Sequence, residues 1–137
     1  MSRKVLAALV LGFVSLGVGI PAWAHHSFAA AYDTSKTMTI KGTITLVRLT
    51  NPHSWFFLDV KDETTGKTNK WAFEAGTPSG MIRNGYKASE IKAGSVVTIQ
   101  YSPAKDPTQN AGMVNQLTTA EGKTFTRFGP VEGTGGQ

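Results

Sequence analysis

A regular alternation of apolar and polar positions begins at Thr37. Apolar residues recur at every second position with polar residues between them, which is the period of a strand with one buried face. Gly42 takes one of the apolar positions without supplying a side chain, and a glycine inside a strand often marks a bulge or a bend. The pattern predicts a long first strand that bends near Gly42 and has an apolar face made of Met38, Ile40, Ile44 and Leu46.

The rest of the chain predicts four more strands and a short helix. The expected strands cover residues 55–60, 70–75, 96–101 and 113–119, with a short extension at 124–125. Between the third and fourth strands, Thr77-Pro78-Ser79 begins a helix that runs through Arg83 and stops at Gly85. This order of elements is that of an OB-fold. We therefore expect an all-β fold with one short helix, an OB-fold-like Greek-key barrel of five to six strands. A β-sandwich is the competing architecture, but the strands are few for it.

The first 24 residues have the three parts of a secretory leader. Arg3 and Lys4 give a basic start, Val5 to Ile20 is an uncharged run of apolar and small residues, and Ala22-Trp23-Ala24 provides the small residues of a cleavage site. A retained anchor is the alternative, but the run of 16 residues is shorter than the roughly 20 that span a bilayer. The sequence predicts a signal peptide cleaved after Ala24, a mature protein that begins at His25, and a periplasmic or secreted location.

One domain is expected after the leader. Residues 25–36 form a lead-in without a sustained strand pattern, 37–128 form the barrel, and the glycine-rich residues 129–137 form a tail that we expect to be disordered. Cleavage removes two basic residues and no acidic one, so the net charge falls from +5 to +3. This mildly basic surface makes nucleic acid an unexpected partner. The chain has no cysteine, which excludes thiol catalysis, thiolate metal sites and disulfides.

Signatures of other catalytic sites are weak. Ser27 and Ser54 each neighbour a histidine in sequence, which does not fix how the side chains are oriented. Residues 76–80 lack the lysine and the spacing of a phosphate-binding loop. Carboxylates such as Glu74 fall at positions typical of a solvated surface. The sequence therefore assigns no catalytic residue.

Two segments are distinctive enough to compare with known families. They are His25-His26-Ser27-Phe28, directly after the leader, and Thr50-Asn51-Pro52-His53-Ser54-Trp55. With residues 32–33, 42–44, 58–62 and 92–97, they resemble a family of small secreted bacterial proteins that is known only as a domain of unknown function. The resemblance runs from His25 to about Lys123 and implies a secreted, OB-like domain. It implies no activity, so function has to be argued from the residues.

All three histidines lie in these two segments. Cleavage before His25 would give this residue a free α-amine, which together with its own Nδ1 can chelate a metal ion in a six-membered ring. A third nitrogen from His53 or His26 would complete a T-shaped arrangement suited to Cu(II). Such a site resembles the histidine brace of copper-dependent oxygenases and of periplasmic copper-binding proteins. The alternative is that His25 and His26 are a polar chain end and that His53 only caps a turn.

Aromatic residues on the second and third strands form another candidate site. Trp55, Phe57 and Trp71 fall where OB-folds bind ligands by stacking. Three lysines lie near them in sequence: Lys61, Lys67 and Lys70. The sequence favours the alternative that at least two of the aromatics are core residues of a barrel without disulfides. In an exported protein, a sugar, a peptidoglycan fragment or an envelope protein is a more fitting partner than nucleic acid.

The sequence thus favours an exported small binding protein over an enzyme, and copper held through His25 with His53 or His26 is the candidate ligand. Two alternatives stay open. One is a small copper-dependent redox enzyme that uses the same site, and the other is an OB-type ligand- or protein-binding module with incidental histidines. No stable membrane anchor is expected after cleavage. The physiological ligand and the oligomeric state are left open.

Overall fold

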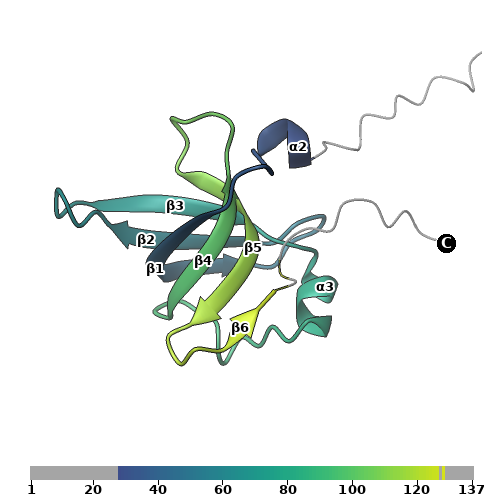
Figure 1. The fold of residues 1–137 in the computed structure, drawn as a ribbon. Coiled ribbons are helices and arrows are strands. Elements are labelled where there is room, and N and C mark those ends of the chain that lie inside the picture. The colour runs from purple at the N-terminus through teal and green to yellow at the C-terminus, as the bar shows by residue number, and fades with distance from the viewer. Residues whose placement is uncertain (1–27, 127, 129–137) are drawn as a thin grey trace, which may run out of the picture.

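The chain forms a small closed barrel (Figure 1). The structure is a computed structural model that describes residues 28–126 and 128. Antiparallel pairings give the strand order β3-β2-β1-β4-β5-β6, and a parallel pairing of β3 with β5 closes the first five strands. The elements are α2 (Phe28–Ala31), β1 (Met38–Arg48), β2 (Trp55–Lys61), β3 (Thr68–Glu74), α3 (Pro78–Arg83), β4 (Val96–Pro103), β5 (Ala111–Thr119) and β6 (Thr124–Phe125).

The expected fold class is confirmed. The described residues form an all-β barrel of five strands with β6 as an extra strand, and α3 lies between β3 and β4 as expected. The difference is α2, a one-turn helix in the lead-in, which no pattern in the sequence predicts. The leader and the tail from residue 129 lie outside the described residues, so the expectations about them stay predictions.

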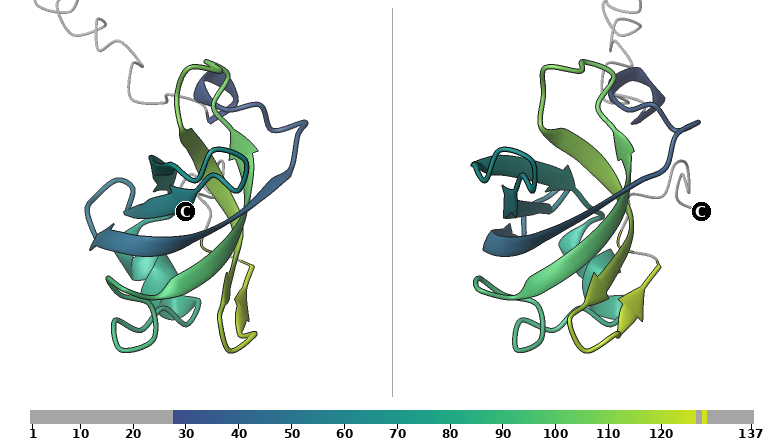
Figure 2. Two further views of the ribbon diagram at one scale, coloured as in Figure 1. Left: turned by 90° about the vertical axis from the view of Figure 1, so that its left-hand side faces the viewer. Right: turned by 60° about the vertical axis from the view of Figure 1, so that its left-hand side comes forward.

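The strands curve around one interior (Figure 2). Apolar side chains from every barrel strand make up the core inside it. Aromatic rings pack inside it: Phe73 meets Tyr101 edge-on at 5.0 Å between ring centroids, and Phe125 stacks on Phe128 at 4.7 Å. Such packing is what a barrel without disulfides needs for its stability. The largest fully buried side chains are Tyr101, Phe56, Phe73, Phe128, Ile44, Leu58, Met81, Ile91, Ile99, Leu117, Val97 and Val114.

Gly42 in β1 lets β2 approach closely. A Cβ atom at this position would lie 2.8 Å from the carbonyl oxygen of Asp59 and 2.9 Å from Cγ2 of Val60, both in β2. A side chain would therefore push the two strands apart. The glycine marks a close approach of two backbones, and the register shift between β1 and β2 lies elsewhere.

The bulge of β1 lies three residues further along the strand. The pairing of β1 with β2 shifts between Ile44 and Leu46, which leaves Thr45 as the extra residue. An extra residue reverses the alternation, so Leu46 points outward and is 44% exposed, while Val47 packs against the core. Of the residues expected on the apolar face of this strand, Ile44 is therefore buried and Leu46 is not. Met38, the first residue of the expected face, is also exposed.

The helix α3 forms where the sequence predicts it. Thr77 is its N-cap, and the N–H of Gly80 donates a 3.1 Å hydrogen bond to the Thr77 hydroxyl. Met81 is buried in the core, and the chain leaves the helix through Gly85, which has a φ of 98°. In Figure 1, α3 lies beside β6. Among the described residues, no helix has the length and apolar character needed to cross a membrane.

Candidate functional site

The loop between β1 and β2 holds His53 beside the end of β3. The hydroxyl of Thr50 donates a 2.9 Å hydrogen bond to the carbonyl oxygen of His53. The next residue, Ser54, forms two backbone hydrogen bonds, of 2.9 and 2.8 Å, with residues 75–76. These contacts fix the backbone of His53 close to Glu74, the last residue of β3.

Glu74 lies between His53 and Tyr32. Its Oε1 is 2.6 Å from Nδ1 of His53, and its Oε2 accepts a 2.5 Å hydrogen bond from the Tyr32 hydroxyl. The side chains of His53 and Glu74 are only 28% and 14% exposed. Burial, together with the hydrogen bond to Glu74 and its negative charge, raises the pKa of Tyr32 well above its usual range. Tyr32 therefore stays a hydrogen-bond donor to the carboxylate. We call these three residues the His53 cluster.

The helix α2 packs against this cluster. The ring of Phe28 lies 4.8 Å from the His53 ring, centroid to centroid, at an angle of 49°. In Figure 1, α2 lies next to the loop between β4 and β5. From that loop, the N–H of Lys105 donates a 3.0 Å hydrogen bond to the carbonyl oxygen of Ala31, and the Lys105 ammonium group donates to that of Ala29. Phe28, the first described residue, is thus held against the ring of His53.

One of the three predicted metal ligands, His53, belongs to the described residues. His25 and His26 lie outside them, three and two residues before Phe28 in sequence. Among residues 28–126 and 128, no group of three or more His, Cys, Asp or Glu side chains is arranged to hold a metal ion. The His53 cluster by itself offers one imidazole nitrogen, so any further imidazole ligand from this chain has to come from His25 or His26.

Sequence reasoning missed Glu74 and Tyr32. Glu74 had the features of a solvated surface carboxylate, and it comes to His53 only because β3 pairs with β2 so that Glu74 lies opposite Trp55. The one available signal for Tyr32 was its place in a segment that resembles the family. Ser54 does not pair with His53: it is fully buried, and its hydroxyl has no hydrogen-bond partner among the described residues.

Two aromatic residues form a flat surface on the outside of the barrel. Trp55 and Phe57 lie on the outer face of β2, while Phe56 between them is buried. Their rings are 6.4 Å apart and inclined by only 25°. The guanidinium carbon of Arg48 lies 5.5 Å from the centroid of the Phe57 ring. We call Trp55 and Phe57 the aromatic platform.

Trp71, the third predicted ligand-face residue, lies on the other side of the sheet. It stacks on Phe73 at 5.7 Å, meets Tyr101 edge-on at 5.8 Å and packs against the core. Trp55 and Phe57 are half-buried and lie outside the core cluster. Only Trp71 packs against the core, so the interpretation that at least two of the three aromatics are core residues is wrong. Of the nearby lysines, Lys70 is ion-paired with Asp59 at 2.5 Å.

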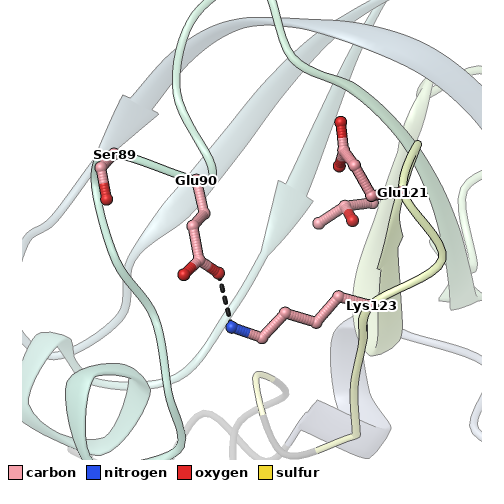
Figure 3. Close-up of a pocket in the computed structure, with 5 residues that line it drawn as sticks. Ser89, Glu90, Glu121 and Lys123 are labelled. Atoms are coloured by element: carbon pink, nitrogen blue, oxygen red, sulfur yellow. Dashed lines mark hydrogen bonds and ion pairs between the residues drawn. The ribbon is translucent and has the colours of Figure 1, made fainter.

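An open pocket lies between the turn after β5 and the loop before β4. It is lined by Ser89, Glu90, Thr119, Glu121 and Lys123. Figure 3 shows Glu90 and Lys123 pointing toward one another, with 2.6 Å between the Lys123 nitrogen and Glu90 Oε2. The hydrogen bond from Lys123 lowers the pKa of Glu90. No residue that the sequence singled out lines this pocket.

Comparisons with known proteins give one result. No curated protein and no solved structure matches the chain. One family model, described as a family of unknown function (DUF6152), matches residues 13–114. The match spans well over half of the 137 residues and includes all three histidines, Tyr32 and Glu74. The chain therefore belongs to this family of unknown function, DUF6152.

Proposed function

We propose that the protein is an exported copper-binding protein in which His25, as the first residue of the mature chain, and His53 hold one copper ion. The observation that carries the proposal is the 4.8 Å contact between the rings of Phe28 and His53. Successive Cα atoms are 3.8 Å apart, so the Cα of His25 lies within about 11 Å of the Cα of Phe28. Three residues of sequence thus separate His25 from a side chain that contacts His53, which supports a shared site.

The donor set fits copper. A neutral imidazole has one N–H and one lone pair. Since the oxygens of a carboxylate only accept hydrogen bonds, the Glu74 contact places the hydrogen of His53 on Nδ1 and the lone pair on Nε2. No described residue forms a hydrogen bond with Nε2. Two nitrogens of His25 and this Nε2 give three nitrogen ligands, which is the kind of set that Cu(II) prefers.

The test is a Cu(II) titration of the processed protein, followed by electron paramagnetic resonance. Mass spectrometry first establishes that the chain begins at His25. We expect one tightly bound Cu(II) with nitrogen hyperfine structure. A matched form whose α-amine is acetylated cannot form the terminal chelate and should bind Cu(II) much more weakly. Equal affinity of the two forms would show that the terminal chelate does not exist.

The third nitrogen is assigned with two variants. We expect His53→Ala to weaken copper binding and to remove one nitrogen from the hyperfine pattern. His26→Ala should leave both unchanged. The opposite result, with an effect of His26→Ala alone, would assign His26 as the ligand and leave His53 out of the site.

The alternative in the enzyme class uses the same copper ion. Bound copper would supply one-electron redox chemistry, and the chain would contribute the ligands and their orientation. Consumption of oxygen or peroxide in the presence of a reductant, measured on the copper-loaded mature form and on the form with the acetylated amine, separates the two classes. Multiple turnovers by the mature form alone would identify an enzyme, whereas copper binding without turnover supports the binding protein.

The aromatic platform favours a second candidate function, the binding of an envelope saccharide. Two half-buried rings on the outer face, with planes inclined by 25°, can stack on sugar rings, and Arg48, Asp59 and Lys70 near them offer hydrogen-bonding groups. Titration with soluble peptidoglycan fragments should change the intrinsic tryptophan fluorescence of the protein. Trp55→Ala should abolish binding and the matched variant Trp71→Phe should preserve it. Equal binding by both variants would exclude the platform as the site.

A further inference from the structure

We infer that Glu74 is a positioning residue that orients His53 as a copper ligand and anchors the α2 turn packed on it, an inference that rests on the proposed function. Its two carboxylate oxygens have different partners. Oε1 meets Nδ1 of His53 at 2.6 Å, and Oε2 accepts the hydrogen bond of 2.5 Å from Tyr32. One side chain thus connects the histidine of the β1–β2 loop with the segment that leads back to His25.

The backbone of Glu74 is well suited to this role. Glu74 lies opposite Trp55 of β2 and beside Met113 of β5, so its strand is paired on both sides at the point where the barrel closes. Its side chain is largely buried between its two partners. Groups on paired strands are held more precisely than groups on loops, and a site of defined geometry needs such support.

The first consequence concerns the ligating atom of His53. The contact with Glu74 fixes the Nδ1–H tautomer, so that Nε2 is the nitrogen available to a metal ion. Histidines that bind metals commonly donate their other N–H to a carboxylate, which orients the ring and makes the ligand more basic. Glu74 therefore selects Nε2 and strengthens it as a ligand.

The second consequence concerns the chain before Phe28. Tyr32 is 5% exposed, and its backbone N–H donates a 2.8 Å hydrogen bond to the carbonyl oxygen of Phe28, which closes the single turn of α2. The hydrogen bond from the Tyr32 hydroxyl to Glu74 ties this turn to the barrel. Glu74 thereby also helps to hold Phe28, the first described residue, against the ring of His53.

The test uses three variants of the mature protein and one matched control. Glu74→Ala removes both contacts, Glu74→Gln keeps the size of the side chain but not its charge, and Tyr32→Phe removes only the second contact. The control is Asp59→Ala, which deletes a carboxylate on the neighbouring strand that pairs with Lys70 and not with His53. Backbone amide spectra establish that each variant is folded.

The first measurement is the tautomer of His53 in the metal-free protein, from nitrogen-15 spectra of the imidazole at a pH where the ring is neutral. We expect the Nδ1–H tautomer in the wild type, in Tyr32→Phe and in the control. Glu74→Ala should shift His53 toward the Nε2–H tautomer, which free histidine prefers. An Nε2–H tautomer in the wild type, or no change in Glu74→Ala, would overturn the first role.

The second measurement is the affinity for Cu(II). We expect Glu74→Ala and Glu74→Gln to bind about 10–100-fold more weakly than the control. Tyr32→Phe should bind more weakly with an unchanged tautomer, and wild-type affinity of this variant would overturn the second role. If wild-type protein binds no copper but the tautomer results hold, the proposed function fails and the orientation of His53 by Glu74 stands. If it binds copper and both Glu74 variants bind equally well, the positioning role fails and the copper site stands.

Discussion

Gly42 is the residue at which the backbones of β1 and β2 leave no room for a side chain. A Cβ atom there would meet the carbonyl oxygen of Asp59 at 2.8 Å, and a paired backbone group cannot move aside easily. We expect Gly42→Ala to lower the free energy of unfolding by about 1–3 kcal/mol, the usual cost of overpacking. Chemical denaturation followed by circular dichroism measures this, with Lys41→Ala, an exposed neighbour on the same strand, as the control. Similar unfolding midpoints for the two variants would contradict the close approach.

The sequence predicted the residue types of the site better than their contacts. His53 stands out because histidines are few and two of its neighbours are Pro52 and Trp55. Glu74 lies 21 positions later in sequence and reaches His53 only through the register of β2 against β3. Register depends on the whole set of pairings in the barrel, which a local pattern does not contain. In the sequence, Glu74 therefore cannot be distinguished from a carboxylate on the solvated surface.

At the scale of the element, the strands and α3 follow from local signals and the β1 bulge does not. The period of two locates each strand, and Thr77, Pro78 and Gly85 mark the limits of α3. In β1, the pattern stays apolar at Leu46 although the extra residue Thr45 has already reversed the faces. Nothing in the composition of residues 43–47 distinguishes a bulge from a regular strand, because the bulge forms where β1 has to curve around the barrel.

Two adjacent phenylalanines of β2, Phe56 and Phe57, lie on opposite faces of the strand. Phe56 is fully buried and stacks on Phe128 at 6.2 Å, whereas Phe57 lies on the outer face in the aromatic platform. We expect Phe56→Ala to lower the free energy of unfolding by about 3–5 kcal/mol, the usual cost of deleting a core aromatic side chain. Phe57→Ala should cost much less and serves as the matched control. Denaturant titrations of both variants test this, and equal losses would mean that Phe57 is also a core residue.

At the scale of the whole molecule, the three tyrosines make the stability of the barrel depend on pH in the alkaline range. Burial raises the pKa of Tyr86 and Tyr101, and burial together with Glu74 raises that of Tyr32 most strongly. In the unfolded chain the phenol pKa is about 10. A folded-state pKa above the unfolded value means that the fold favours the neutral phenol. This contribution to stability is complete below pH about 10 and is lost as the pH rises further.

We therefore expect the denaturant midpoint to fall steeply above pH about 10, with tyrosinate absorbance appearing only as the protein unfolds. Circular dichroism and ultraviolet absorbance, recorded along the same pH series, test whether ionisation and unfolding coincide. Tyr32→Phe removes the group with the largest shift, so its stability should depend less on pH in this range than that of the wild type. Ionisation of all three tyrosines near pH 10 in a protein that stays folded would contradict their burial. Because Tyr32 lies in the lead-in and the other two lie in the barrel, a single coincident transition would also show that α2 and the barrel unfold as one unit.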